Sequence, residues 1–545
     1  MNTAPGLVYL FEDSIRKHWD HPSLSDYGGR TFSFREVGEQ IFKYHGIFKA
    51  LGIKKGDKIA LIGKNSATWG IVYLATVTFG AVIVPILPDF KPKDFHYIVN
   101  HSDALVLFVE EPIFREMNRD EMPQLEAILG IPDLKVHYVR DNALQLQLES
   151  ALAVEPQTNR DAFSLVHSSD DDVAVISYTS GTSGFSKGVV LQHKSLQANI
   201  LYAHRNMPLV NTDKILSFLA MAHAFGCTFE FLFPFTLGCQ ITFLNKIPSP
   251  STIITAFGDI RPALILTVPL TIEKIYKNRL KQVLKKPAIR VLIHIPLIDK
   301  LILKKFHKKL YELFGGRLKE LVIGGAPFNH EVEDFFHKIR FPYTVGYGMT
   351  ECGPLISYAS WKTTRKGAAG RVVDELELKI DSPDPGTIPG EIMVRGSHVM
   401  LGYYKNEEAT KQVLEPNGWL HTGDMATMDE HGNLFIRGRS KSMILGPSGQ
   451  NIYPEEHESM LNNRTMVLES LVVHREEQLV ALICPDREAM KKHGISDEQL
   501  PELFKGYIHD LNHQVPKYAR VASFEIRQTE FEKTPKRNPK RFLYK

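Results

Sequence analysis

Short runs of β-branched and other apolar residues recur through the first two thirds of the chain, and stretches with helical periodicity separate them. The runs cover residues 58–62, 81–86, 104–108, 173–178, 241–243, 264–268 and 320–323. Strands that alternate with helical stretches of about 10 to 15 residues indicate βαβ units. Because nearly every position in these runs is apolar, we expect strands buried on both faces of largely parallel sheets.

The pattern changes after Gly367. Strand-like segments at 376–380, 391–394 and 434–437 now alternate with turn sequences, of which Asp-Ser-Pro-Asp-Pro-Gly at 381–386 and Glu-His-Gly-Asn at 430–433 are the clearest. Strands joined by short turns of this composition pair with their neighbours in antiparallel fashion. The pattern therefore predicts a small antiparallel or barrel-like unit.

A second change follows Gly438-Arg-Ser-Lys441. A Gly/Pro/Ser loop at 446–449 leads to a helix that we expect to begin near Pro454, because Glu455 and Glu456 suit a first helical turn. Strands are predicted at 471–474, 479–484 and 522–526. The whole pattern predicts an α/β protein in which a large N-terminal domain of parallel-rich, helix-covered sheets plus a small β-barrel spans residues 1–437. A compact α+β domain spans 438–545.

Composition excludes several classes of protein. The 545 residues allow about three to five folding units. Lys and Arg number 65 against 62 Asp and Glu, a net charge of +3, which argues against a dedicated nucleic-acid binder. Four cysteines lie far apart without metal-ligand spacing and are expected to be reduced, mostly buried thiols of a cytoplasmic protein: Cys227, Cys239, Cys352 and Cys484.

The uncharged stretch 65–88 is long enough to cross a bilayer. Gly70, Gly80, Pro85 and Pro88 interrupt it, so a core helix followed by a buried strand is the preferred prediction. Glu12 and Asp13 precede any long apolar run, and we therefore expect no secretory signal.

The strongest local motif is Tyr178-Thr-Ser-Gly-Thr-Ser-Gly-Phe-Ser-Lys-Gly-Val189, a hydroxyl- and glycine-rich loop directly after an apolar strand. Small residues let backbone N–H groups approach an anion, and Lys187 adds a positive charge. The order of residues is not that of a Walker A loop. Taken alone, such a loop is more often an ordinary flexible connection. The predicted phosphate contacts are Thr179, Ser180, Gly181, Thr182, Ser183, Gly184 and Lys187.

Four further motifs follow in a fixed order. They are Gly324-Gly-Ala-Pro327, Tyr347-Gly-Met-Thr-Glu351, Gly418-Trp-Leu-His-Thr-Gly-Asp424, and Gly438-Arg-Ser-Lys441 with Gly449-Gln-Asn-Ile-Tyr-Pro-Glu-Glu456. Together with the first loop, which is similar to YTSGTTGxPKGV, this series resembles the adenylate-forming superfamily of acyl-CoA synthetases, luciferases and peptide-synthetase adenylation domains. The resemblance covers nearly the whole chain. It implies an AMP-binding domain, a mobile C-terminal lid with its hinge at Lys441, and ATP, Mg²⁺ and coenzyme A as cofactors.

Each motif residue also suits its implied role chemically. Glu351, with Thr182, is the predicted Mg²⁺ ligand, since a hard cation takes carboxylate oxygen together with substrate phosphate. Thr350 suits the α-phosphate, and Tyr347 offers a face for adenine. Asp424 can accept from the ribose hydroxyls, with Arg439 beside it. The resemblance also assigns nucleotide contacts to Gly324, Gly325, Ala326, Pro327, Gly348, Met349 and Ile436. The competing interpretations are a capped helix for Thr350-Glu351, a core tyrosine for Tyr347 and a solvated turn for Asp424.

The segment 218–226 resembles the part of the family in which a His or aromatic residue gates the carboxylate pocket. His223 is the predicted gate, and the alternative is a hydrogen-bonded core histidine. The predicted pocket residues are His223, Phe225, Gly226, Val345 and Gly346. His193 is a weaker candidate and stays outside the predicted site.

The expected substrate is a fatty acid. No acidic residue lies within 218–226 to hold a substrate amine, which favours an uncharged acyl tail. Residues 268–276 are similar to bacterial long-chain fatty acyl-CoA synthetases. The resemblance implies fatty acid–CoA ligase activity through an acyl-adenylate. Acyl carrier protein as acceptor, and a weakened homologue that only binds adenylates or acyl-CoA, stay open as alternatives.

The C-terminal tail departs from the resembling pattern KTPxGKIxR. Aligning Lys533-Thr-Pro535 and Arg541 with that pattern places Asn538 where the family has a phosphate-neutralising lysine. Lys536 or Lys540 is the predicted substitute, and adenylation is expected to be slow. The predicted catalytic residues are Thr182, Glu351, Lys441, Asn538 and Lys540.

Residues 274–309, here called the basic segment, carry twelve basic residues and one acid, Asp299. Apolar residues are interleaved at helical spacing, so the pattern predicts a basic helical hairpin. Such a hairpin suits peripheral contact with an anionic membrane. A solvated basic face beside the active site is the equal alternative.

Overall fold

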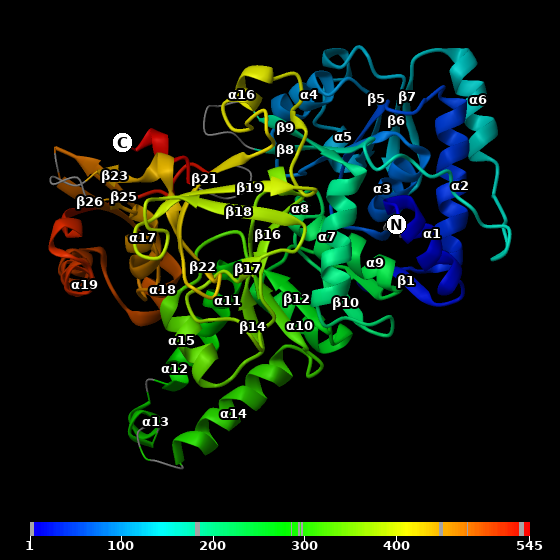
Figure 1. Cartoon of the computed structure of the whole chain (residues 1–545). Helices are drawn as coiled ribbons and strands as arrows, with labels where there is room; N and C mark the ends of the chain where they lie inside the picture. The colour runs from blue at the N-terminus through cyan, green and yellow to red at the C-terminus, as the bar shows by residue number, and fades with distance from the viewer. Residues whose placement is uncertain are drawn as a thin grey trace.

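The computed structural model describes residues 5–179, 186–284, 286–292, 295, 298–445, 451–476, 478–533 and 539–544. Two large sheets, two small antiparallel sheets and a C-terminal module make up the fold (Figure 1). The α/β class predicted from the sequence is confirmed.

An eight-stranded sheet in the order β20-β9-β8-β4-β3-β5-β6-β7 forms the first part of the molecule. Its centre is parallel, while β9 pairs antiparallel with β8 and β20, and β7 pairs antiparallel with β6. The strands are β3 Lys58–Ile62, β4 Val82–Ile86, β5 Ala104–Glu110, β6 Ala127–Ile131, β7 Val136–Val139, β8 Val173–Thr179, β9 Lys187–Gln192 and β20 Gly402–Tyr403. Strand β3 has the bounds predicted from the sequence, 58–62. Its apolar residues are buried, as expected for a strand inside a parallel sheet.

Helices cover this sheet, and α3 is the most buried of those whose residues we describe. All but two of its 13 residues are buried, Ser66 accepts a hydrogen bond from the N–H of Trp69 at its start, and Gly80 ends it with φ +83°. The prediction of a core helix followed by a buried strand is therefore confirmed. No helix in the described part is long and apolar enough to cross a bilayer. The N-terminal helices are α1 Leu7–Lys17, α2 Phe34–Ala50, α3 Ala67–Phe79, α4 Pro92–His101, α5 Glu111–Phe114, η1 Arg119–Glu121 and α6 Asn142–Leu152.

A seven-stranded sheet in the order β14-β13-β12-β10-β11-β1-β2 forms the second part, and only β2 runs antiparallel to its neighbour. Its strands are β1 Pro22–Asp26, β2 Thr31–Ser33, β10 Lys214–Ser217, β11 Gln240–Phe243, β12 Leu264–Thr267, β13 Glu320–Ile323 and β14 Tyr343–Val345. The accompanying helices are α7 His193–Asn206, α8 Ala224–Gly226, the π-helix η2 Cys227–Leu232, α9 Phe233–Leu237, α10 Pro250–Ile260 and α15 His330–Lys338. All four cysteines are free and buried, as predicted.

The predicted small unit after residue 367 is antiparallel. Its four-stranded sheet consists of β18 Leu376–Asp381, β19 Gly390–Gly396, β21 Leu420–Met428 and β22 Leu434–Arg439. A three-stranded sheet of β15 Tyr347–Gly348, β16 Leu355–Tyr358 and β17 Arg371–Val372 lies before it in the chain. The short helices η4 Thr350–Cys352 and α16 Glu407–Lys411 belong to the connecting loops.

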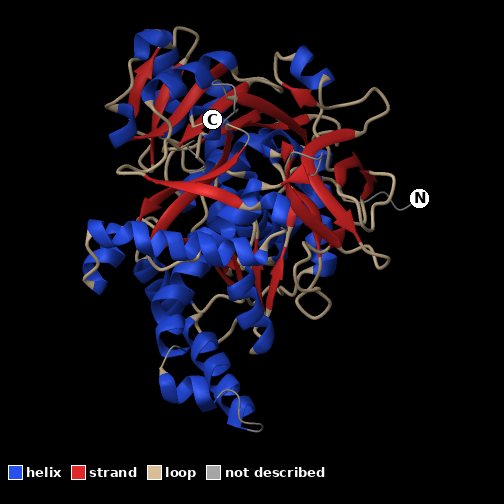
Figure 2. Cartoon of the chain, turned by 90° about the vertical axis from the view of Figure 1, so that its left-hand side faces the viewer, coloured by secondary structure: helices blue, strands red, loops and turns tan. Residues whose placement is uncertain are grey.

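The basic segment is helical, as predicted, and it projects from the body of the molecule in two views at right angles (Figures 1 and 2). Its elements are α11 Pro269–Ile275, the π-helix η3 Tyr276–Leu280, α12 Lys281–Leu284, α13 Pro287–Leu292 and α14 Ile298–Leu313. Phe306 and Leu310 of α14 are buried, whereas Leu301 is 69% exposed.

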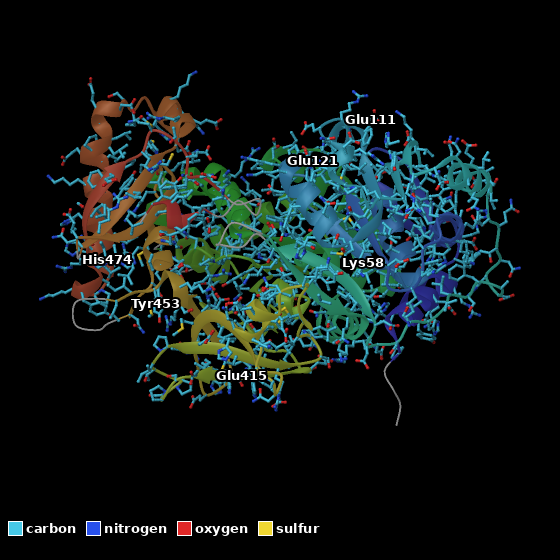
Figure 3. The ribbon with its side chains drawn as sticks, turned by 90° about the horizontal axis from the view of Figure 1, so that it is seen from above. Lys58, Glu111, Glu121, Glu415, Tyr453 and His474 are labelled. Atoms are coloured by element: carbon cyan, nitrogen blue, oxygen red, sulfur yellow. The ribbon has the colours of Figure 1, made fainter. Side chains whose placement is uncertain are left out.

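The C-terminal module has its own core, in which Phe504 and Leu482 are fully buried. Seen from above, the ribbon that carries Tyr453 and His474 lies at one end of the molecule and that of Lys58 and Glu111 at the other (Figure 3). Its elements are η5 Ser440–Ser442, β23 Ile444–Leu445, β24 Asn451–Ile452, α17 Pro454–Asn462, β25 Val467–Arg475, β26 Gln478–Pro485, α18 Arg487–His493, η6 Asp497–Gln499, α19 Leu500–Gln514, η7 Lys517–Ala519, β27 Val521–Ile526 and η8 Arg541–Leu543. The boundary at 437/438 stays a prediction.

Candidate functional site

The Ser/Thr/Gly loop joins two antiparallel neighbours. Thr179, at the end of β8, pairs with Lys187, at the start of β9, and the Thr179 hydroxyl donates to the carbonyl oxygen of Lys187 at 3.5 Å. The two predicted phosphate residues at the ends of the loop are thus held side by side. Five others lie outside the described residues, so their contacts stay predictions: Ser180, Gly181, Thr182, Ser183 and Gly184.

Lys187 and Glu351 both contact Tyr403, a residue that the sequence motifs do not include. The Tyr403 hydroxyl donates to Glu351 Oε1 at 2.9 Å, and Lys187 Nζ lies 4.7 Å from the centre of the Tyr403 ring. Pairing of β20 with β9, in register Tyr403 with Val189, brings these residues together. The structure therefore places the predicted phosphate lysine and the predicted metal carboxylate in one cluster.

The loop that carries Glu351 is fixed from behind by buried side chains. On α7, Asn199 Nδ2 donates to the Cys352 carbonyl at 3.1 Å, and its Oδ1 accepts from the N–H of Leu355 at 2.9 Å. Gly348 permits the tight path of the loop, since a Cβ there would lie 2.2 Å from the carbonyl oxygen of Pro354. Thr350 and Met349 lie on the same loop, next to Glu351. The loop thus presents Glu351 from a rigid frame.

The predicted adenine and ribose residues are hydrogen-bonded to each other. The Tyr347 hydroxyl donates to Asp424 Oδ2 at 2.8 Å, and Arg439 Nε lies 3.3 Å from Asp424 Oδ1. Burial raises the pKa of Asp424, and the Arg439 guanidinium acts against that shift. Asp424 is buried and therefore not a solvated turn, while the adenine role of Tyr347 stays a prediction. Ile436 lies on β22, whose ladder also aligns Asp424 with Arg439.

Two of the predicted loops leave neighbouring parallel strands at the same edge. Gly324 and Gly325 follow β13, and Gly346 follows β14, which pairs with β13. A Cβ on Gly324 would lie 3.3 Å from the Phe225 ring and 3.4 Å from the Gly346 carbonyl oxygen. Gly325 has φ +86°, which favours glycine. Ala326 and Pro327 continue the loop, and Val345 ends β14. The two loops and Phe225 thus pack together.

An acid just beyond the pocket segment 218–226 binds back to it. His223 precedes α8, and both His223 and Phe225 are partly exposed. Glu230, fully buried on η2, accepts hydrogen bonds from the N–H groups of Phe218 and Leu219 at 3.0 Å each through Oε2. Burial raises the pKa of Glu230 well above its ordinary value. This acid is used to hold the backbone of the segment.

The residues fit Mg²⁺ bound mainly through substrate phosphates. Among the described residues no group of three or more His, Cys, Asp or Glu side chains could hold a metal. Glu351 offers one carboxylate, already aligned by Tyr403. One or two carboxylates with phosphate oxygens are the usual arrangement for Mg²⁺, which would neutralise charge on the phosphates when bound.

The C-terminal catalytic candidates are only partly described. Lys441 lies exposed on η5, directly after β22, and Asn538 lies outside the described residues. Lys540 Nζ binds Glu532 Oε1. The Lys540 ammonium lowers the pKa of Glu532, and Lys91 and Lys93 near α4 contribute. Glu532 of the tail thus interacts with the lysines at the start of α4, and Lys540 is engaged with an acid of its own module.

His193 lies away from the cluster. It begins α7 directly after β9, so the length of β9 separates it from Lys187. Its ring is buried, and burial lowers its pKa to about 4. Its exclusion from the predicted site agrees with this position.

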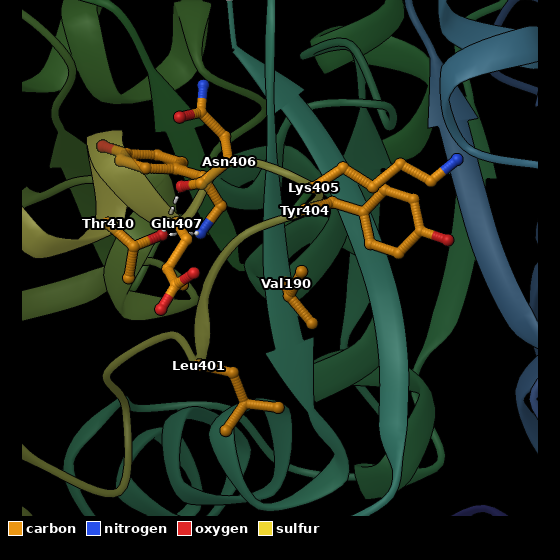
Figure 4. A pocket seen from close by; sticks show the side chains of 9 residues that line it. Val190, Leu401, Tyr404, Lys405, Asn406, Glu407 and Thr410 are labelled. Atoms are coloured by element: carbon orange, nitrogen blue, oxygen red, sulfur yellow. Dashed lines mark hydrogen bonds between the residues drawn. The ribbon is translucent and has the colours of Figure 1, made fainter.

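An open pocket of about 590 Å³ lies at β20 (Figure 4). Val190, Leu401, Tyr404 and Lys405 line it together with residues of α16 and Tyr403. The labelled side chains come from β9 and the segment 401–410, and neither Tyr347 nor Asp424 lines the pocket.

Comparison with known proteins extends this geometry. The model of the AMP-binding enzyme family matches residues 11–404, and that of the AMP-binding enzyme C-terminal domain matches residues 441–544. A long-chain-fatty-acid–CoA ligase of Escherichia coli O157:H7 is 28% identical over 494 residues, which cover 86% of this chain and 82% of that protein. A chloroplastic long-chain-fatty-acid–[acyl-carrier-protein] ligase of Arabidopsis thaliana is 26% identical and covers 95% and 80% of the two chains.

Among solved structures, the anthranilate CoA ligase AuaEII in complex with anthranoyl-AMP aligns with a TM-score of 0.81. The two sequences are 21% identical, and the alignment covers 100% of this chain and 97% of that chain. At this identity the alignment establishes the shared fold.

Proposed function

Because the chain belongs to the AMP-binding enzyme family, we propose that it activates a fatty acid with ATP and transfers the acyl group to coenzyme A. The observation that carries the proposal is a pair of clusters linked by the loop 347–351: Lys187, Tyr403 and Glu351 for phosphate and Mg²⁺, and Tyr347, Asp424 and Arg439 for adenosine. The first half-reaction needs charge stabilisation and positioning more than covalent chemistry by the protein.

The chemistry proceeds in two displacements. A carboxylate oxygen of the fatty acid attacks the α-phosphorus of ATP, the bond to the β-phosphate oxygen breaks, and pyrophosphate leaves. The coenzyme A thiolate then attacks the acyl carbonyl, and AMP leaves. In the first step Lys187 stabilises phosphate charge, Thr350 donates to the α-phosphate, and Asp424 orients the ribose by accepting from its hydroxyls.

The acyl pocket is assigned to His223, Phe225, Gly226, Val345 and Gly346. Packing of Phe225 against Gly324 supports this, since it links the pocket segment to the nucleotide loops. An uncharged tail is favoured because no acidic residue lies within 218–226, and Glu230 beyond it is fully buried, with its Oε2 accepting two backbone hydrogen bonds. The names of the long-chain relatives support a fatty acid.

Fatty-acid-dependent exchange of pyrophosphate into ATP tests the proposal. The expected result is exchange that requires ATP, Mg²⁺ and a fatty acid, and thioester formation when coenzyme A is added. Nucleotide or acyl-CoA binding without any exchange would contradict it and favour the weakened homologue.

Transfer to acyl carrier protein is a second candidate, because one relative is named as a ligase of that type. Comparing free coenzyme A with holo acyl carrier protein as acceptor for the same acyl-adenylate separates the two. We expect coenzyme A to be the better acceptor. A higher kcat/KM with the carrier protein would reverse the assignment.

The C-terminal residues 438–545 are proposed to act as a lid that turns at Lys441 between the half-reactions. Asn538 then replaces a lysine in the first orientation, and Lys540 is the proposed substitute. The match of a separate C-terminal family model from residue 441 supports this division of the chain.

The basic segment is proposed to rest on an anionic membrane, where the fatty acid partitions. Its projection from the body supports this, as do Lys300, Lys304, Lys305 and Lys309, all exposed, beside exposed Leu301 (Figure 2). Binding to anionic vesicles at low salt, lost at high salt, is the expected result. Equal binding to neutral vesicles, or none to either, would favour a solvated basic face.

A further inference from the structure

The segment 400–404 holds Glu351 at two points. The N–H of Met400 donates to the Glu351 backbone carbonyl at 2.8 Å, and the Tyr403 hydroxyl donates to the Glu351 carboxylate at 2.9 Å. The N–H of Tyr403 donates to Thr410 Oγ1 at 2.9 Å, which fixes the backbone of Tyr403 itself. Both the main chain and the side chain of Glu351 are thus positioned by one segment.

The same segment is also tied to the strand that carries Lys187. The N–H of Leu401 donates to the Val190 carbonyl at 3.0 Å, and the N–H of Tyr404 donates to the Gly188 carbonyl at 2.7 Å. Between these two hydrogen bonds, Tyr403 presents its ring to the Lys187 ammonium at 4.7 Å from the ring centre. This distance is within the range of a cation–π interaction. One side chain therefore contacts two residues of the predicted site that belong to different elements.

Tyr403 is a hydrogen-bond donor in this arrangement. Its hydroxyl proton is directed at Glu351 Oε1, which lies 2.9 Å from the hydroxyl oxygen.

We propose that Tyr403 is a positioning residue that fixes the Glu351 carboxylate and the Lys187 ammonium relative to each other around the triphosphate and its Mg²⁺. This inference rests on the proposed function and adds to it a residue outside the adenylate-forming motifs quoted above. A carboxylate whose orientation is fixed needs less reorganisation when metal and phosphate arrive. Removing a hydrogen bond behind a metal ligand typically lowers metal affinity by about 10- to 100-fold.

Two substitutions separate the two contacts. Tyr403→Phe removes the hydroxyl and keeps the ring under Lys187, whereas Tyr403→Leu removes both. Tyr404→Phe is the matched control, because the Tyr404 hydroxyl donates to Asp103 at 2.8 Å, away from Glu351. Mg²⁺ dependence and the KM for ATP are measured in the exchange reaction. Mn²⁺ binding is measured by electron paramagnetic resonance with α,β-methylene-ATP, which cannot be cleaved at the reacting bond.

Tyr403→Phe is expected to raise the Mn²⁺ dissociation constant and the Mg²⁺ requirement about tenfold, with the ATP KM nearly unchanged. Tyr403→Leu is expected to raise the ATP KM as well, and Tyr404→Phe to change neither. Thermal unfolding of each variant shows whether it folds. Wild-type metal dependence in a folded Tyr403→Phe, or equal effects in Tyr403→Phe and Tyr404→Phe, would overturn the proposal.

The Mn²⁺ measurement also separates this inference from the proposed function. If the wild type shows no fatty-acid-dependent exchange but binds Mn²⁺ with the analogue, the function is wrong and the Tyr403 effect is still measurable. If the wild type does not bind Mn²⁺ with the analogue, the role of Tyr403 is wrong too.

Discussion

Charged residues of the candidate site, here called the edge, and those of the basic segment are arranged in opposite ways. At the edge, Glu351 is bound by Tyr403, and Asp424 by Tyr347 and Arg439. In α14, no ion pair among the described residues involves the exposed Lys300, Lys304, Lys305 or Lys309. The edge thus fixes charges within the protein, whereas the segment leaves like charges to be neutralised by something outside it.

The two regions differ in support as well. Buried Asn199 braces the Glu351 loop, while only one side of α14, at Phe306 and Leu310, is buried. The first part of the basic segment, 274–281, makes more contacts with the body. Lys281 pairs with Glu331 at 2.8 Å, and Lys277 Nζ donates to the Arg464 carbonyl of the C-terminal module at 3.1 Å. Substitutions at the edge should therefore change catalysis, and those in α14 should change where the protein binds.

Replacing Glu351 is expected to have the largest effect. Glu351→Gln keeps the shape but removes a charge that is aligned by Tyr403, so exchange should fall by about 100- to 1,000-fold. The measurement is exchange as a function of Mg²⁺ concentration. Glu377→Gln on β18, where the carboxylate is exposed and paired with Arg395, is the matched control and should have no effect. Wild-type exchange at limiting Mg²⁺ in Glu351→Gln would refute the metal assignment.

Restoring a lysine in the C-terminal tail should raise the rate of adenylation, whereas Glu351→Gln lowers it. Asn538→Lys restores the expected donor and should speed adenylation by about 100-fold, with thioester formation from supplied acyl-adenylate less affected. Glu532→Gln releases Lys540 from its ion pair and should also speed adenylation if Lys540 is the substitute.

Lys540→Ala should then slow adenylation. If Asn538→Lys, Lys536→Ala and Lys540→Ala all leave adenylation unchanged, the tail has no part in the chemistry.

The sequence predicts most of the strands because buried parallel strands need continuous apolar runs. Strands 58–62 and 320–323 have the predicted bounds, and α17 begins at Pro454 as predicted. The basic helices were also predicted, since apolar residues recur at helical spacing between the lysines. Such signals are local, and they are readable without knowledge of the fold.

The residues of the site that the sequence did not predict depend on contacts between distant segments. Tyr403 reaches Glu351 only because β20 pairs with β9, and Asn199 reaches the same loop from α7. Glu230 lies four residues beyond the 218–226 window, and only the turn of η2 brings it back to Phe218. The sequence does offer two signals that point to them. Glu230 is an acid within an apolar run, and Tyr403 is the first of two tyrosines after Gly402.

Neutralising two lysines of α14 should weaken membrane contact without changing catalysis. At about 1 kcal/mol per lysine near an anionic surface, Lys300→Gln with Lys304→Gln should lower vesicle binding by about 30-fold. Lys491→Gln with Lys492→Gln, also exposed, is the matched control in the C-terminal module. Co-sedimentation measures binding, and exchange with a water-soluble acid measures catalysis. A loss of exchange in the α14 variant would mean that α14 takes part in catalysis, and the two regions would then not differ in function.

The smallest expected effect is acid sensitivity of the buried support behind Glu351. His398 is fully buried, its Nδ1–H donates to the Leu355 carbonyl at 2.8 Å, and its Nε2 lies 3.9 Å from the Glu375 carboxylate, which pairs with Arg205.

Burial lowers the pKa of His398 to about 4, against an ordinary value near 6.5, so between these values the unfolded chain binds the extra proton and stability falls as the pH falls. From pH 7.5 to 5.5 this histidine should cost about 1.4 kcal/mol of the free energy of unfolding. Denaturant unfolding at both pH values should show a smaller pH dependence in His398→Gln than in the wild type. Equal pH dependence in the two proteins would mean that the imidazole is protonated without penalty, so that burial behind Glu351 does not restrain its titration.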